Sequence, residues 1–478
     1  MGETLRPDLC IIGAGAAGLS VAVSAAAFGV PTVLIERGEM GGECLNTGCV
    51  PSKALIAAAR AAKGPPAALC SLDQLRAPRL DYQHVMAHVK SVIADIAPSD
   101  SAARLAAFGV TVIRSEAAFI DRFTVAAGDT LIKARRFVIA SGSKPTIPTL
   151  VGLETLPYLT NETVFDLPER PGHLLIIGAG PIGCELGQAF RRLGSEVTLF
   201  DQGLLLPRED RELAGVVQGA LARDGVVLRE RVRLSAAAAI GGVRLHYSDA
   251  ASTPREATGT HLLVAVGRTP RTADLGLEAG WIKYDKGGII VDHGMRTSNR
   301  RVFAIGDCAG GAANGLRYTH AASLQAGLVI RNALFRLPAR FDPMAVARVT
   351  YTDPEIAAGG LSEEEARERH GHVRILRFPL GETDRARAEA EPEGLVKVIA
   401  STRGLILGAA ICGKGAGEMI PLWMLALREK MKLSKIAGLA MPYPTLSEAA
   451  RRAALEFYAP LTRRPFIRHL LRFLRAFG

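Results

Sequence analysis

The sequence predicts an α/β protein, and three observations carry this prediction. The chain of 478 residues contains 50 glycines but is only 5% aromatic, which suits a backbone that approaches ligands closely. An apolar run, DLCII, leads into the glycine pattern GAGAAG at 13–18. A second run, LLII, leads into GAGPIG at 178–183. Both patterns are typical of a strand, a tight turn and a helix, the repeating unit of α/β folds.

The first glycine pattern predicts a dinucleotide site. Gly13 permits the tight turn, Gly15 lets the backbone reach a pyrophosphate, and Gly18 lets the helix pack on the strand. The next strand, PTVLIE, ends at Glu36, eighteen residues after Gly18, where a carboxylate can accept the ribose hydroxyls. Residues 9–35 are apolar enough to resemble a membrane-spanning helix, but their glycines favour strand, turn and helix.

The second pattern repeats the first. Gly178, Gly180 and Gly183 follow a strand, and Asp201 ends the next strand, again eighteen residues after the third glycine. A tight turn alone is the alternative for either pattern, but the flanking strand, helix and acid favour a binding site in both. Asp201 favours NADH, because a carboxylate repels a 2′-phosphate, while the nearby Arg208 keeps NADPH as the alternative. Two dinucleotides in one chain imply electron transfer between them.

Two cysteines lie between the patterns, in the segment GGECLNTGCVPSK at 41–53. A regular helix would separate Cys44 and Cys49 by roughly 7.5 Å, beyond disulfide reach, so the segment must bend if the two residues pair. A helix that begins near Pro51 would direct its N-terminus at Cys49 and stabilise a thiolate. A redox couple and a structural disulfide are both compatible with this spacing. No second cluster of Cys or His completes a zinc site, so we predict no metal site.

This segment resembles the redox segment of the FAD-dependent pyridine nucleotide-disulfide oxidoreductases, the family of dihydrolipoyl dehydrogenase, glutathione reductase and mercuric reductase. The resemblance covers about residues 8–456. Five further motifs support it in the same order: IASGSKPTIP at 139–148, VAVGRTPRT at 264–272, VFAIGDCAGG at 302–311, THAASLQAG at 319–327 and VTYTDPEIAAGGLSEEEA at 349–366. It implies two Rossmann-like dinucleotide-binding domains, for FAD and NAD(P), and a C-terminal α/β interface domain. It also implies FAD and NADH as cofactors, with NADPH as the alternative, and a homodimer as the working unit.

The same resemblance implies a path of electrons from NAD(P)H through FAD to a disulfide between Cys44 and Cys49. Cys49 would be the thiolate beside the flavin, and Cys44 would attack the acceptor. Lys53 and Glu185 would form a catalytic ion pair beside the flavin ring. The implied FAD-binding residues are Gly13, Gly15, Ala16, Gly18, Glu36, Arg37, Gly42, Lys53, Ala140, Ser141, Gly142, Ser143, Gly306, Asp307 and Thr319. The implied NAD(P)-binding residues are Gly178, Gly180, Ile182, Gly183, Asp201 and Gly267.

The segment AMPYPTLSEAARRAA at 440–454 departs from most disulfide-reducing members of that family. Those members place a histidine, supplied by the partner subunit, where this chain has Tyr443, although Glu448 fits the pattern. A phenol titrates near 10 and is a poorer acid-base than imidazole at neutral pH. The best interpretation is therefore a mercuric reductase-like flavoprotein whose acceptor is a disulfide, a thiophilic metal ion or another small molecule.

Two alternatives to this interpretation stay open. The chain shows neither the N-terminal metal-binding CxxC domain nor the C-terminal cysteine pair of mercuric reductase, so dihydrolipoyl dehydrogenase is the first alternative. A catalytically weak FAD-binding scaffold or membrane-associated subunit is an alternative of another class. The cysteine pair, Lys53, Glu185 and both glycine patterns argue against a scaffold.

The motifs also predict the domain boundaries. We expect the FAD domain at 1–148 and 273–340, the NAD(P) domain at 149–272, the interface domain at 341–458 and a basic tail at 459–478. Turn-rich stretches between these segments support the boundaries.

The tail region carries much of the formal net charge of +11, because seven arginines and a single acid, Glu456, lie from Arg451 onward. Phenylalanines and leucines recur there at helical spacing, with arginines on another side, which predicts a basic amphipathic helix. Such a helix lies on an anionic membrane surface or packs at the dimer interface, and both alternatives stay open. Scattered cysteines and the lack of a secretory signal predict a cytoplasmic protein. If the tail binds a membrane, we expect the protein to lie at the inner face of that membrane. No nucleic-acid-binding fold is recognisable.

Overall fold

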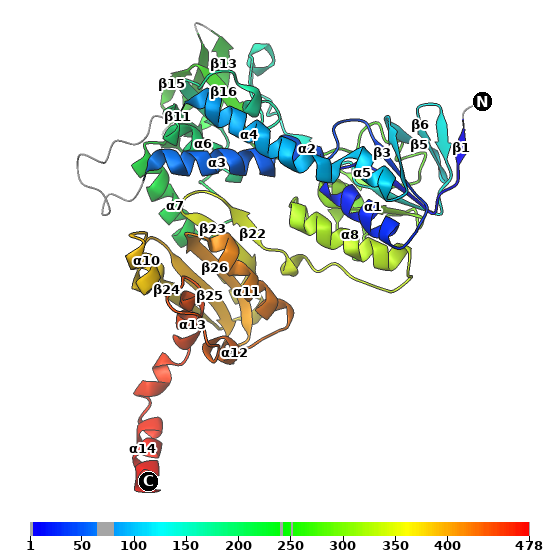
Figure 1. Cartoon of the computed structure of the whole chain (residues 1–478). Helices are drawn as coiled ribbons and strands as arrows, with labels where there is room; N and C mark the ends of the chain where they lie inside the picture. Colours follow the sequence, from blue (N-terminus) through cyan, green and yellow to red (C-terminus); the bar gives the residue numbers. More distant parts are fainter. Residues whose placement is uncertain (1–2, 65–80, 240–241, 250–251, 478) are drawn as a thin grey trace. The chain divides into compact units, whose positions relative to one another are not determined.

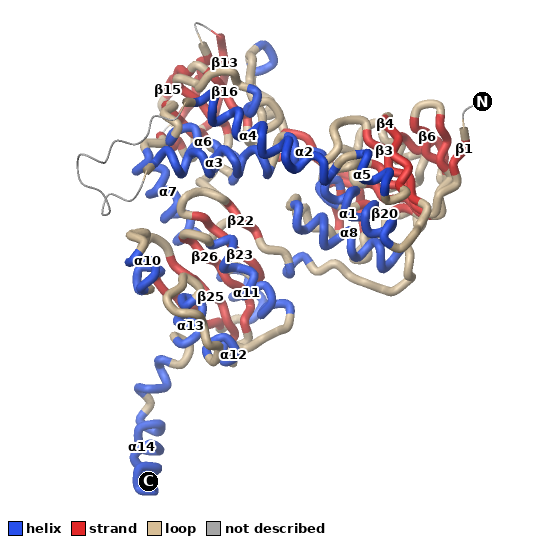
Figure 2. Tube along the Cα trace, viewed as in Figure 1, coloured by secondary structure: helices blue, strands red, loops and turns tan. Residues whose placement is uncertain are grey.

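The structure is a computed structural model that describes residues 3–64, 81–239, 242–249 and 252–477. The chain forms two compact units, whose elements are labelled in Figure 1 and coloured by type in Figure 2. The first unit comprises residues 1–59, 79–202 and 231–343, and the second comprises 60–78, 203–230 and 344–478. Both glycine patterns and both cysteines of the redox segment lie in the first unit.

A five-stranded parallel sheet forms part of the first unit, in the order β20-β8-β2-β3-β4. Its strands are β2 (Leu9–Ile12), β3 (Thr32–Glu36), β4 (Val110–Arg114), β8 (Arg136–Ile139) and β20 (Val302–Ala304). α1 (Ala16–Ala27) follows β2 through the first glycine pattern and packs against α8 (Thr319–Ala333). Near-continuous burial along β2 and β3 is typical of a parallel sheet inside an α/β layer. The predicted α/β fold is therefore confirmed.

A second parallel sheet places β10 (His173–Ile177) between β11 (Glu196–Phe200) and β16 (His261–Val264). α6 (Pro181–Arg192) follows β10 through the second glycine pattern. An antiparallel sheet contains β13 (Arg233–Ala239), β14 (Val243–Ser248) and β15 (Pro254–Gly259). Leu175, Phe200 and Leu245 from these two sheets share one buried core.

Smaller elements complete the first unit. β1 (Thr4–Leu5), β7 (Thr130–Ile132), β6 (Thr124–Ala127) and β5 (Ala117–Asp121) form one sheet in that order. The other short strands are β9 (Ser143–Pro145), β17 (Arg268–Pro270), β18 (Tyr284–Asp285), β19 (Gly288–Val291) and β21 (Ala309–Gly311). The other helices are α2 (Gly42–Asn46), α3 (Cys49–Lys63), α4 (Tyr82–Ile96) and α5 (Ala102–Ala107), with the end of α3 counted in the second unit.

A five-stranded antiparallel sheet is the centre of the second unit, in the order β22-β23-β26-β25-β24. Its strands are β22 (Arg348–Thr350), β23 (Glu355–Gly360), β24 (Val373–Pro379), β25 (Leu395–Ser401) and β26 (Ile406–Gly413). The accompanying elements are α7 (Arg211–Asp224), β12 (Val227–Arg229), α9 (Glu363–His370), α10 (Asp384–Ala388), α11 (Ala416–Arg428), α12 (Leu433–Ala437) and α13 (Glu448–Leu455). One core joins the sheet to α11, α12 and α13, with Trp423 fully buried in it.

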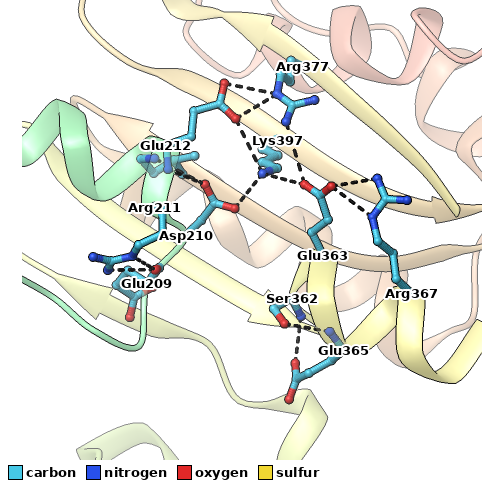
Figure 3. A network of polar contacts seen from close by, with 11 residues as sticks. Glu209, Asp210, Arg211, Glu212, Ser362, Glu363, Glu365, Arg367, Arg377 and Lys397 are labelled. Carbon is cyan, nitrogen blue, oxygen red and sulfur yellow. Dashed lines mark hydrogen bonds and ion pairs between the residues drawn. The ribbon is translucent and has the colours of Figure 1, made fainter. Parts of the chain in front are cut away.

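A buried lysine ties α9 and the start of α7 to this sheet (Figure 3). Lys397 on β25 has a side chain that is 5% exposed, and its ammonium lies 2.7 Å from Asp210 and 2.9 Å from Glu363. Glu212 lies 3.5 Å from the same nitrogen. Burial disfavours the charged form of Lys397, but the hydrogen bonds to Asp210 and Glu363 outweigh burial and raise the pKa of Lys397. A charge cluster therefore joins segments that are distant in sequence.

The chain ends in α14 (Pro465–Leu474) and a 3₁₀ turn at Arg475–Phe477. The helix predicted for the tail is therefore present, and none of the residues of α14 is buried. Within the described ranges, no helix is both long enough and apolar enough to cross a membrane.

Candidate redox site and nucleotide sites

The two glycine turns have the same backbone geometry. Gly13 adopts a φ of +105° and Gly178 a φ of +112°, in the region that favours glycine. A Cβ atom at Gly18 would lie 1.9 Å from the Gly13 carbonyl oxygen, and one at Gly183 would lie 1.9 Å from the Gly178 carbonyl oxygen. Only glycine therefore lets each helix pack so closely on its turn.

An acid at the end of the following strand is hydrogen-bonded to each turn. The Glu36 carboxylate accepts a hydrogen bond from the Ala14 N–H at 2.5 Å, and the Asp201 carboxylate accepts one from the Ala179 N–H at 2.7 Å. A Cβ atom at Gly180 would meet no atom within 4 Å, so the backbone of the second turn is open to a ligand. This arrangement fits a dinucleotide, with a pyrophosphate at the helix N-terminus and a ribose at the acid.

The cysteine segment packs against the first turn. Gly15 forms an isolated bridge with Gly41, and a Cβ atom at Gly42 would lie 2.6 Å from the Gly15 Cα. The other predicted cofactor residues are placed as follows: Ala16 begins α1, Ala140 and Ser141 follow β8, Ile182 lies in the first turn of α6, Gly267 precedes β17, and Gly306 begins a short 3₁₀ turn. Arg37 pairs with the exposed Glu116 at 3.4 Å.

A polar network joins several residues that the sequence predicts to contact the flavin. Ser143 donates a hydrogen bond to the Asp307 carboxylate at 2.6 Å, and Arg268 donates one to the Ser143 hydroxyl at 2.8 Å. A Cβ atom at Gly142 would meet no atom within 4 Å. An oriented carboxylate beside open backbone fits a flavin nucleotide, whose sugar hydroxyls need hydrogen-bond acceptors.

The segment at 41–53 bends between its two cysteines. Cys44 lies on α2, and α3 begins at Cys49, two residues before the predicted start at Pro51. Both cysteines are free thiols. The Thr319 hydroxyl donates a hydrogen bond to the Cys44 sulfur at 3.2 Å and lies 3.7 Å from the Cys49 sulfur. The bend therefore brings both sulfur atoms to one hydroxyl group.

The two thiols differ in acidity. A hydrogen bond from Cys44 and the positive charge of Lys53 lower the pKa of Cys49 to about 6, against the effect of burial. The hydrogen bond to Cys49 and burial raise the pKa of Cys44 well above its usual range. At neutral pH, Cys49 therefore carries the negative charge and Cys44 keeps its proton.

Lys53 and Glu185 form an ion pair with a nitrogen–oxygen distance of 2.9 Å. Lys53 lies on α3, one turn after Cys49, and Glu185 is buried on α6. The pair thus joins the cysteine helix to the helix of the second glycine pattern. Lys53 favours the Cys49 thiolate and Glu185 opposes it, so the pair tunes the acidity of this thiol.

Comparison with known proteins decides the family. Residues 7–326 match the pyridine nucleotide-disulphide oxidoreductase family, and residues 346–454 match the dimerisation domain of that family. The chain belongs to this family. It is therefore an FAD-dependent oxidoreductase that uses NAD(P)H.

Similar proteins within the oxidoreductase family have different names. A mercuric reductase from Lysinibacillus sphaericus is 33% identical over 94% of this chain and 82% of its own length. A dihydrolipoyl dehydrogenase from Pseudomonas aeruginosa is 34% identical over 95% of this chain and 98% of its own length. Among solved structures, the Cu(II) complex of the HOCl-induced flavoprotein disulfide reductase RclA from Escherichia coli is similar with a TM-score of 0.82 and 26% identity. That match covers 93% of this chain and 98% of RclA.

Sequence reasoning about this oxidoreductase missed Glu43, the residue before Cys44. Its carboxylate pairs with Arg268 and accepts a hydrogen bond from Asn161 at 2.9 Å. Burial raises the pKa of Glu43 to about 7, although Arg268 opposes the shift. The only sign of Glu43 in the sequence is that it is an acid inside the glycine-rich cysteine segment. Its partners Asn161 and Arg268 lie 118 and 225 positions away.

Tyr443 and Glu448 lie in the second unit of the oxidoreductase. The Tyr443 hydroxyl donates a hydrogen bond to Asp384 at 2.7 Å, which raises the pKa of Tyr443. Glu448 accepts a hydrogen bond from Arg452 at 2.9 Å. Asp384 is a second residue that sequence reasoning missed, and it makes the phenol a weaker acid than free tyrosine. Among residues that the structure describes, no group of three or more His, Cys, Asp or Glu side chains is arranged to hold a metal ion.

Proposed function

We propose that this oxidoreductase passes electrons from NADH through FAD to a Cys44–Cys49 disulfide, and from the reduced pair to a thiophilic metal ion or an activated small disulfide. The first glycine turn, Glu36 and Asp307 would hold FAD, and the second turn with Asp201 would hold NADH. When bound, the two cofactors supply hydride transfer and the storage of two electrons.

The side chains around the cysteines support this chemistry. The hydrogen bond from Cys44 and the charge of Lys53 hold Cys49 as a thiolate, while Cys44 keeps its proton. When Cys44 loses that proton to the solvent or the acceptor, its sulfur attacks a disulfide or binds a soft metal ion. The Thr319 hydroxyl donates a hydrogen bond to Cys44, lies 3.7 Å from the Cys49 sulfur, and would orient the pair during these steps.

Our choice of acceptor rests on Tyr443 and its hydrogen bond to Asp384. A basic alkyl thiol that leaves a mixed disulfide needs a proton, which a histidine normally supplies in the disulfide-reducing relatives. The hydrogen bond to Asp384 raises the pKa of Tyr443, so the phenol is a poor proton donor at neutral pH. Metal ions and disulfides with acidic leaving thiols do not need this proton. The mercuric reductase relatives and the Cu(II) complex of RclA support a metal ion as the acceptor.

Dihydrolipoyl dehydrogenase is the second candidate, because a relative with that name matches this chain over almost its whole length. The two candidates differ in their turnover of lipoamide. The test measures kcat/KM for lipoamide, an activated aromatic disulfide, Hg(II) and Cu(II) in the wild type, Tyr443→Phe and Tyr443→His.

We expect slow turnover of lipoamide by the wild type and little effect of Tyr443→Phe on the activated disulfide. Tyr443→His should raise lipoamide turnover if Glu448 orients the new ring. Wild-type turnover of lipoamide on the order of 100 per second would restore dihydrolipoyl dehydrogenase as the better assignment. Failure of NADH to reduce the bound flavin without oxygen would instead favour a scaffold that no longer turns over.

We infer further that the protein is a homodimer, because it carries the dimerisation domain of its family. We also infer that it works in the cytoplasm.

A further inference from the structure

The C-terminal helix α14 exposes large apolar side chains. Phe466 is 73% exposed and Phe477, in the turn that follows, is 74% exposed. Leu470, Leu471, Phe473 and Leu474 are also exposed. Singly exposed apolar residues are normal on a protein surface, but six within twelve positions form a patch of the kind that marks an interaction site.

The apolar and basic residues of α14 lie on different sides of the helix. With 3.6 residues per turn, Phe466, Leu470 and Phe473 share one side, and Arg468 and Arg472 lie on another. Among the residues that the structure describes, no carboxylate forms an ion pair with Arg464, Arg468, Arg472 or Arg475. The sequence from 457 to 478 contains no Asp or Glu. The helix therefore has one side with only positive charges and another side of aromatic and aliphatic residues. This arrangement is typical of helices that lie in a membrane interface.

We propose that α14 is a membrane-binding helix that lies in the plane of an anionic bilayer surface. Phe466, Leu470 and Phe473 would enter the boundary between headgroups and acyl chains, and Arg468 and Arg472 would contact lipid phosphates. The helix of 10 residues is about 15 Å long, whereas a bilayer core is about 30 Å thick, so α14 lies on the membrane rather than across it.

Charge and position favour this partner over a second copy of the chain. A second tail would bring the same arginines and no carboxylate to face them. The match to the dimerisation domain ends at 454, whereas α14 begins at Pro465. The helix therefore lies outside the residues that match the dimerisation domain.

The first unit offers a matched control for non-specific charge. Arg6, Lys133 and Arg301 line a cleft of about 430 Å³ at the amino ends of β2, β8 and β20, and all three are exposed. The triple variant Arg6→Gln/Lys133→Gln/Arg301→Gln removes the same charge as Arg468→Gln/Arg472→Gln/Arg475→Gln. A third variant, Phe466→Ser/Leu470→Ser/Phe473→Ser, keeps the tail charge and removes apolar area.

The experiment measures co-sedimentation of the full-length, FAD-loaded protein with two kinds of vesicle, phosphatidylcholine alone and phosphatidylcholine mixed with phosphatidylglycerol. We expect binding to the anionic vesicles only, and weaker binding as salt rises. The tail arginine variant should bind on the order of 100-fold more weakly, the apolar variant should also lose binding, and the cleft variant should bind like the wild type.

Reduction of the flavin by NADH in every variant checks that the protein is folded, because none of the changed residues lies in the redox or nucleotide sites. Equal losses in the tail arginine and cleft variants would overturn the proposal in favour of non-specific charge. Wild-type vesicle binding by both tail variants, with a shift from dimer to monomer in light scattering, would assign α14 to the subunit interface instead. Absence of binding to either vesicle by the wild type would also overturn the proposal.

Discussion

The thiols of Cys44 and Cys49 have pKa values shifted in opposite directions, although the two residues lie only five positions apart. Their sequence spacing is compatible with either a structural disulfide or a redox couple. The difference in acidity comes from the environment, because Cys49 accepts a hydrogen bond from Cys44 and lies near Lys53. A pair with one stable thiolate is suited to electron transfer rather than to structural cross-linking.

The first prediction concerns the Cys49 thiolate in the two-electron-reduced protein. Its long-wavelength absorption band with the flavin should be present above a pH of about 6 and should fade as pH falls through that value, because the pKa is lowered. Lys53→Met removes a stabilising charge and should move the midpoint up by roughly one unit, whereas Glu185→Gln should move it down. Spectrophotometric pH titration measures both shifts. Cys49→Ser should abolish the band, and its persistence would show that another group is the donor.

A second prediction concerns Asp201. NADH should have the higher kcat/KM in the wild type, because the carboxylate repels the 2′-phosphate of NADPH. Asp201→Ala should reduce the preference on the order of tenfold. Asp201→Asn is the matched control, since it removes the charge but keeps an oxygen that can accept the Ala179 N–H. A wild-type preference for NADPH, or an unchanged preference in both variants, would contradict the assignment.

At the scale of elements, helices and strands distant in sequence are joined by buried charge. α9 and the start of α7 meet at Lys397 on β25, and Arg377 on β24 adds a contact to Glu212 at 2.8 Å (Figure 3). The ammonium of Lys397 is the central cation, because Asp210, Glu212 and Glu363 all lie within 3.5 Å of it. Removal of this cation would leave three neighbouring carboxylates without their shared partner.

The third prediction follows from this cluster. Lys397→Met should lower the free energy of unfolding of the second unit by about 2–4 kcal/mol. This loss is smaller than the loss on breaking a fully buried ion pair, because the carboxylates around Lys397 are partly exposed. Urea unfolding followed by fluorescence of Trp423, which is fully buried in that unit, measures the change. Arg367→Met removes an exposed pair with Glu363 four positions away and should cost less than about 0.5 kcal/mol. Equal effects of the two variants would contradict a central role for Lys397.

The same cluster should make stability depend on acid. The hydrogen bond from Lys397 lowers the pKa of Glu363, so its contribution is complete above the unfolded pKa, near 4.3, and is lost as pH falls through the folded pKa. In Lys397→Met this part of the acid dependence should be smaller.

At the scale of the whole molecule, the fourth prediction concerns subunit pairing. Light scattering should give a mass near twice the 50.7 kDa of the chain, because the second unit carries a dimerisation domain. Leu425 is 53% exposed on α11, and we expect a second copy to cover it. Leu425→Glu should shift the protein toward monomer, since a carboxylate in an apolar contact is unfavourable. Leu337→Glu, at an exposed site in the first unit, serves as the control. A monomeric wild type would refute the pairing.

The sequence by itself determined the two strand-turn-helix units, because the positions of Gly13, Gly18, Gly178 and Gly183 follow from local backbone sterics. The amphipathic character of α14 was equally local, since helical spacing alone separates its arginines from its phenylalanines. Only the tertiary structure decided the partners of charged groups. Glu43 meets Arg268, Tyr443 meets Asp384 and Lys397 meets Asp210, each across tens to hundreds of positions. Such contacts leave no periodic trace in a sequence, because they depend on which segments the packed sheets and helices bring together.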